Sequence, residues 1–219
     1  KIGNYVGAAT LFKTLASGDD ILAQQSAYYL GISTLQNKQL LDAKVAFRVA
    51  QKLDYDIQIQ EEATYNLIKI LLDGKETTEA INQLQSYLAT YPTGKYVDES
   101  NELLSEVFFS TNNYQAAIDY IEKLQKRTSK INEAYQKITY NQGVLDFNAE
   151  RYDNSVVYFN KSLSTPIDPQ LRLQANFWKA EALLIQNKPE AENLYKTLIA
   201  SSDKAISLNS TYSLAYAYF

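Results

Sequence analysis

Cysteine, histidine and methionine are all missing from this sequence of 219 residues. Without cysteine the chain forms no disulfide and offers no thiolate to a metal, so the redox compartment stays open. Without histidine it lacks both the commonest metal ligand and the commonest general base. Glycine and proline are scarce too, with 7 and 4 residues, a composition that suits helices. Because even position 1 carries no methionine, we expect a fragment of a longer protein.

Charge of one sign and long apolar runs are limited as well. The net charge is −4, and lysine and arginine are spread along the chain. No basic run is therefore available to neutralise the phosphates of a nucleic acid. No apolar run approaches the length of about 20 residues that spans a bilayer. We expect a folded chain with a protein or peptide partner, no nucleic acid, no transmembrane segment and no cofactor.

What the sequence does contain is a repeat with a period of 35 to 38 residues. One set of small residues marks it: Ala8, Ala43, Ala80, Ala117, Ser155 and Ala191. A large apolar residue follows four positions after each of them: Phe12, Phe47, Leu84, Ile121, Phe159 and Tyr195. This spacing is typical of the buried face of an amphipathic helix. A second set marks a preceding helix in each unit, and all its members except Ile68 are small enough to let two helix backbones approach closely: Gly31, Ile68, Ser105, Gly143, Ala180 and Ala215.

Turn residues separate the two helices of each unit. Asn, Asp or Gly stands at every such turn, and these residues tolerate the left-handed backbone that ends a helix. The pattern predicts about twelve helices, at residues 4–17, 20–36, 39–53, 58–72, 77–90, 95–111, 113–127, 130–148, 151–164, 168–186, 188–201 and 204–219. It predicts an all-α fold, a single solenoid of antiparallel helix pairs over residues 1–219. Its repeat units are expected at 1–18, 19–56, 57–93, 94–129, 130–167, 168–202 and, in part, 203–219.

The clearest unit runs from Tyr140 to Leu163 and has Gly143, Ser155 and Phe159 at characteristic positions. In these residues the chain resembles tetratricopeptide (TPR) repeat proteins, and the resemblance covers nearly all of it. It implies a right-handed superhelical solenoid of about six repeats, and a protein-binding role. The period exceeds the usual 34 residues. Similar lengthened repeats occur in bacterial envelope TPR proteins, which implies the periplasm or cell envelope, with the cytoplasm as the alternative.

The first helix of each pair lines the concave groove of a TPR solenoid. Three residues before each first-helix anchor, five of six positions are aromatic: Tyr28, Tyr65, Glu102, Tyr140, Phe177 and Tyr212. Such a row could hold an extended or helical peptide. The alternative is that these rings pack between repeats, which is the commoner use of an aromatic stripe. The single tryptophan, Trp178, is expected in the core for the same reason.

Glu102 interrupts the aromatic row and shares a helix face with Glu99 and Glu106. If this face lines the groove, it favours a partner that carries Lys or Arg; the alternative is a solvated face. The predicted partner-binding residues are Tyr28, Tyr65, Glu102, Glu106, Tyr140, Phe177 and Tyr212. Recognition of a carboxyl terminus, as in the carboxylate-clamp subclass of the TPR family, is not indicated, because only Lys69 suits it.

Catalytic patterns are not found. The sequence contains no phosphate loop, no Gly-rich dinucleotide turn and no zinc-ligand spacing, and a Ser or Thr nucleophile would have no His partner. We therefore predict an interaction scaffold without catalytic, cofactor-binding or metal-binding residues. One alternative is a structural spacer or assembly module of a larger bacterial envelope protein. Another is an auxiliary glycan-processing component whose catalytic domain lies elsewhere.

Overall fold

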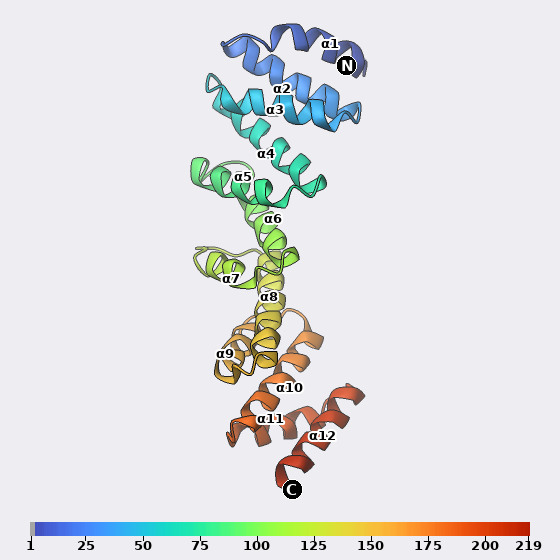
Figure 1. Cartoon of the computed structure of the whole chain (residues 1–219), viewed down its shortest axis with the longest axis vertical. Helices are drawn as coiled ribbons and strands as arrows, with labels where there is room; N and C mark the ends of the chain where they lie inside the picture. The colour runs from blue at the N-terminus through green and yellow to red at the C-terminus, as the bar shows by residue number, and fades with distance from the viewer. Residues whose placement is uncertain (1–2) are drawn as a thin grey trace. The chain divides into compact units, whose positions relative to one another are not determined.

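A computed structural model describes residues 3–219, and this part of the chain forms twelve α-helices and no strand (Figure 1). Their bounds are α1 Tyr5–Leu15, α2 Ile21–Gln36, α3 Leu40–Lys52, α4 Ile57–Asp73, α5 Thr77–Thr90, α6 Val97–Ser110, α7 Tyr114–Glu122, α8 Ser129–Asn148, α9 Tyr152–Leu163, α10 Pro169–Ile185, α11 Glu190–Ile199 and α12 Lys204–Tyr218. The predicted all-α fold is confirmed.

One helix is shorter than predicted. The sequence predicts a helix at 113–127, whereas α7 ends at Glu122. Its last turn tightens, because the N–H groups of Lys123 and Leu124 bond to carbonyls three residues back. The Arg127 guanidinium then donates to the Ile121 carbonyl oxygen at 3.1 Å, which satisfies a carbonyl that no further helical turn would reach.

The chain divides into two compact units, residues 1–104 and 105–219, and the division falls inside α6. Within each unit the even-numbered helices are the first helices of the predicted pairs and the odd-numbered helices are the second. The pairs are antiparallel, since Gln24 at the start of α2 reaches Ala50 and Leu53 at the end of α3. In Figure 1 the ribbon runs through each unit as a succession of such pairs.

The turn from first to second helix has the same geometry in all five pairs. The residue after the helix has a positive φ, and it is Lys38, Lys75, Asn112, Glu150 or Asn187. The next N–H bonds back to a carbonyl five residues earlier, as from Glu76 to Leu71 at 2.9 Å, which is the Schellman motif. The prediction of Asn or Gly at the left-handed position is wrong for three of the five turns. Gly74, for example, has a φ of −77°, and Lys75 takes the left-handed position.

Two glycines let a ring of the second helix lie directly on the first helix. A Cβ atom added to Gly31 would lie 2.6 Å from the Phe47 ring, and one added to Gly143 would lie 2.8 Å from the Phe159 ring. Contacts this short leave no room for a side chain. At the same position α4 has Ile68, and the smaller Leu84 replaces the ring; both are fully buried. The two members of the pair therefore compensate in size.

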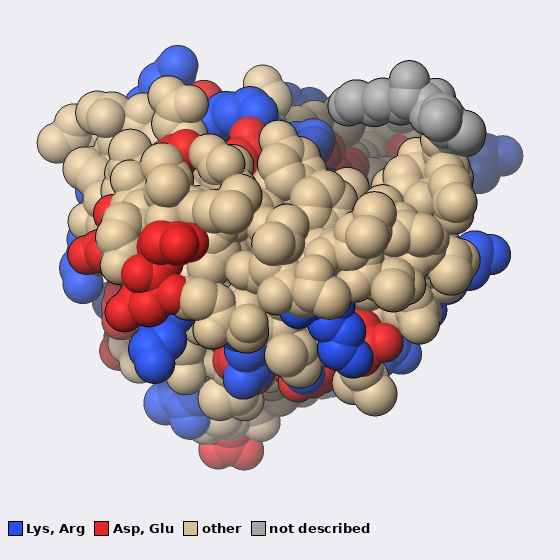
Figure 2. Space-filling view, turned by 90° about the horizontal axis from the view of Figure 1, so that it is seen from above, with Lys and Arg blue, Asp and Glu red and all other residues tan. Residues whose placement is uncertain are grey.

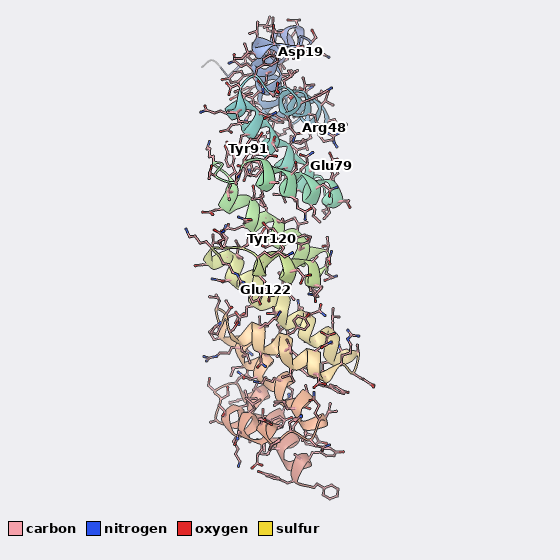
Figure 3. All side chains as sticks on the ribbon, turned by 90° about the vertical axis from the view of Figure 1, so that its left-hand side faces the viewer. Asp19, Arg48, Glu79, Tyr91, Tyr120 and Glu122 are labelled. Carbon is pink, nitrogen blue, oxygen red and sulfur yellow. The ribbon has the colours of Figure 1, made fainter. Side chains whose placement is uncertain are left out.

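A glutamine in each unit ties a helix pair to the next one, a feature that the sequence analysis missed. The Gln24 amide donates to the Leu53 carbonyl at 2.5 Å and accepts from the Asp56 N–H at 2.7 Å. Gln136 does the same with the carbonyl and N–H of Asp168, at 3.0 and 2.7 Å. On the other side of the first unit, Arg48 of α3 pairs with Glu79 of α5 at 2.5 Å (Figure 3).

Candidate partner-binding surfaces

In the first unit, the predicted aromatic row lies largely within the packing. Tyr65 is only 4% exposed and its ring stacks on Tyr96 with centroids 3.8 Å apart. Tyr28 is half-buried, and its ring lies 6.0 Å from that of Phe47 on the following second helix. Tyr28 therefore has a partly accessible edge, while Tyr65 packs against its neighbours as a core residue does.

A polar cluster surrounds these rings. The Tyr96 hydroxyl and the Lys95 ammonium group both donate to the Glu62 carboxylate, at 2.6 and 2.7 Å. Burial alone would raise the pKa of Glu62, but the bonds from Lys95 and Tyr96 outweigh it and lower that pKa below its usual value. Burial, followed by the Glu62 carboxylate, raises the pKa of Tyr28. The cluster satisfies its own charges and serves to hold the α5–α6 loop.

In the second unit, the row becomes more accessible along the chain. Tyr140 is half-buried against Phe159, with ring centroids 5.9 Å apart. Phe177 is also half-buried, and its ring meets Trp178 edge-on at 5.6 Å. Tyr212 is 74% exposed. The exposure follows the packing, because Tyr212 has no second helix after it among the described residues.

Tyr212 lines a hollow between α10 and α12 with a volume of about 520 Å³. Its other lining residues are Glu181, Leu184, Ile185, Asn187, Ser213, Tyr216 and Ala217. The Glu181 carboxylate accepts hydrogen bonds from the Tyr195 and Ser213 hydroxyls at 2.8 and 2.5 Å, which fix its position. Tyr216 is 69% exposed. A fixed carboxylate thus lies among apolar and aromatic side chains. Sequence reasoning named Tyr212 but missed Glu181 and Tyr216.

The predicted acidic residues do not form one described surface. Glu102 belongs to the first unit and Glu106 to the second, on either side of the division within α6. Glu102 is half-buried, whereas Glu106 and Glu99 are exposed. Glu99 lies close enough to Tyr65 to add to the rise in the pKa of that hydroxyl, which burial causes in the first place.

A second hollow, of about 380 Å³, lies in the first unit on the side of the second helices. Its walls come from α1 and α3 and include Val6, Val45 and Val49, and its floor is α2 with Leu30 and Thr34. No residue of the predicted row takes part. The sequence analysis missed this groove because it considered only the first-helix face.

Two kinds of site are not found among residues 3–219. No group of three or more acidic side chains is placed to hold a metal ion. None of the described helices is both long and apolar enough to cross a membrane. The surfaces above offer single carboxylates, hydroxyls and rings, which are groups suited to binding.

Antiparallel helix pairs, a period of 35 to 38 residues and a ring packed on a small residue together define a TPR-like helical-repeat protein. No family model and no curated protein matches the chain. Among solved structures it is similar to the C-terminal part of a TPR repeat-containing protein from Cytophaga hutchinsonii. Identity is 17% and the TM-score 0.49, with 99% of this chain and 83% of that chain covered.

Two further solved structures are similar at the same level. MamA from Desulfovibrio magneticus RS-1 is 11% identical with a TM-score of 0.41, covering 87% of this chain and 92% of that one. The apo form of RapI is 14% identical with a TM-score of 0.48, covering 98% and 64%. All three scores lie below 0.5, so the class assignment rests on the helix pairs and contacts of this chain.

Proposed function

We propose that this chain is a non-catalytic interaction module that binds a segment of another protein in the hollow between α10 and α12. The observation that carries the proposal is the combination of Glu181 with the exposed rings of Tyr212 and Tyr216 around one hollow. Tyrosines that are exposed in the free protein can bury a large area on binding at a low cost in side-chain entropy.

The chemistry of the hollow defines the class of partner. Leu184 and Ile185 offer apolar walls, and Glu181 offers the one carboxylate among the lining residues. A carboxylate held by two hydroxyls is already oriented, so it attracts a cationic group without further ordering. The partner segment that fits carries a Lys or Arg next to an apolar side chain.

Selection from a phage-displayed library of random peptides tests the proposal. We expect the wild-type chain to enrich peptides with a basic residue beside an apolar one. Tyr216→Ala should weaken a selected peptide about tenfold or more, since it removes an exposed ring. Glu181→Gln keeps an oxygen that accepts from Tyr195 and Ser213 but removes the charge, so it should weaken the basic peptides and flatten their salt dependence.

Leu145→Ala is the matched control. Leu145 is an exposed apolar residue on α8 and is not among the lining residues of the hollow. This variant should bind the selected peptides as the wild type does. Enrichment of no peptide, or equal binding by the Tyr216 and Glu181 variants, would refute the groove.

The second candidate function is a structural spacer or assembly module. The observation that favours it is the burial of Tyr65, since a ring packed between helices contributes stability and no contact with a partner. We also propose the periplasm or cell envelope as the location, on the lengthened repeat. Fractionation of the native cells tests this, and recovery in the cytoplasm alone would contradict it.

A further inference from the structure

The last helix, α12, leaves open a face that its equivalent covers. Within the second unit, Ser210 and Leu214 of α12 are buried. In α10, Ala180 is fully buried in one cluster with Tyr195 of α11. The residue 35 positions later, Ala215, occupies the same place in the repeat and is exposed. The face of a first helix that normally receives a second helix is therefore open on α12.

The first helix, α1, has the complementary property. In α3 the three residues that pack on α2 are Ala43, Phe47 and Ala50, and all are fully buried. The corresponding residues of α1 are Ala8, Phe12 and Leu15, and α1 contains no buried residue at all. Leu11, next to them, is 70% exposed, while its counterpart Ala46 is buried. The face of a second helix that normally packs on its first helix is open on α1.

We infer that α12 of one molecule binds α1 of a second copy of this chain. Each molecule would then supply the half of a helix pair that the other lacks. The contact is head-to-tail, so both molecules keep one open face and the assembly can grow.

The register of the two helices supports this contact. Phe12 stands on α1 where Phe47 stands on α3 and Phe159 on α9. Ala215 stands on α12 where Gly31 and Gly143 lie under those rings. Phe12 can therefore pack over Ala215, a residue small enough to allow the approach.

A second contact of the repeat is also available. The rings of Tyr28 and Tyr140 on the first helices lie 6.0 and 5.9 Å from Phe47 and Phe159 on the second helices. Tyr212 is the equivalent first-helix residue on α12 and is 74% exposed. In the assembly it would meet Phe12 in the same way, because both residues keep their positions in the repeat.

The charge content of the two helices fits a buried contact. Lys13 is the one charged residue in α1, and Lys204 is the one in α12. Charged residues are depleted from the centre of stable interfaces. Figure 2 shows the end of the first unit that carries α1, and side chains other than acidic and basic ones cover most of its middle.

Sedimentation velocity over a concentration series of the 219-residue chain tests the inference. The wild type should show a weight-average mass that rises from the monomer mass to twofold or more. Leu11→Glu blocks α1 and Ala215→Glu blocks α12, and each variant alone should stay monomeric. Mixed in equal amounts, they should form a dimer that does not grow, because the first keeps an intact α12 and the second an intact α1.

Two controls separate this contact from general stickiness and from unfolding. Leu41→Glu changes a residue on α3 that is 76% exposed and should leave the association unchanged. All variants should melt within a few degrees of the wild type. A wild type that stays monomeric at every concentration overturns the inference, and so do variants that associate alone or fail to complement each other. Peptide binding to the Glu181 hollow would survive that result, since it uses a different face.

Discussion

The pair α2–α3 and the pair α4–α5 solve the same packing problem with opposite residues. In the first pair Gly31 is under the large ring of Phe47, and a Cβ atom there would lie 2.6 Å from that ring. In the second pair the larger Ile68 and the smaller Leu84 stand at the same two positions, both fully buried. The repeat therefore conserves the combined volume of two facing residues and not the identity of either one.

The largest effect that would sharpen this comparison is expected from Ile68→Ala. If Ile68 fills the space that a ring fills elsewhere, its truncation leaves a cavity, and the free energy of unfolding should fall by about 3 kcal/mol. Urea denaturation followed by circular dichroism measures this. Ile57→Ala, at an exposed position on the same helix, is the control and should change stability little. A loss below about 1 kcal/mol for Ile68→Ala would mean that its neighbours collapse into the space.

Gly31→Ala and Gly143→Ala test the other side of the comparison. One added methyl group should cost about 2 kcal/mol each, because the Phe47 and Phe159 rings leave no space for it. Gly7→Ala is the control, since a Cβ atom there would meet only the side chain of Asn4. The same urea titration applies. A gain in stability for Gly31→Ala would show that the two backbones separate without penalty.

The turns of the two pairs should respond alike although their cores differ. Lys38 and Lys75 have φ values of 62° and 58°, where a side chain is strained and glycine is not. Lys38→Gly and Lys75→Gly should each raise the free energy of unfolding by about 0.5 to 1 kcal/mol. Thermal melts can resolve this gain. Unequal responses would indicate that a lysine side chain makes a contact specific to one turn.

The smallest effect concerns pH and exists in only one of the two pairs. Glu62 of α4 has a lowered pKa, whereas α2 has the uncharged Gln25 at the equivalent position. A carboxyl group with a lower pKa in the folded state stabilises it above the unfolded pKa and loses this contribution as pH falls through the folded value. Glu62→Gln should therefore reduce the loss of stability between pH 6 and pH 3. The change should be less than about 1 kcal/mol, because the group is partly solvated. Equal pH profiles for variant and wild type would contradict it.

The period, the helix pairs and the facing anchors could be predicted from the sequence, because each is a residue type at a fixed spacing. The left-handed Lys38, Lys75 and Glu150 could not, since the backbone bonds of the turn impose that conformation on whatever residue follows the helix. The tying role of Gln24 was hidden for a similar reason: its partners are backbone atoms about 30 residues away.

The accessibility of the aromatic row was beyond sequence reasoning. Tyr65 and Tyr212 have the same side chain and the same place in the repeat, yet their exposed fractions are 4% and 74%. The difference comes from the helices packed around each residue, which no local pattern records. The identity of Glu181 as a groove residue depends in the same way on its bonds to Tyr195 and Ser213.

A double-mutant cycle on Gly31 and Phe47 tests most directly the claim that facing residues share one volume. Unfolding free energies would be measured for Gly31→Ala, Phe47→Leu, the double variant and the wild type. We predict that Phe47→Leu relieves the strain of Gly31→Ala, so that the double variant is more stable than the sum of the single effects by about 1 kcal/mol or more. Additivity within about 0.5 kcal/mol would show that the two residues do not compete for the same space, and would contradict the account.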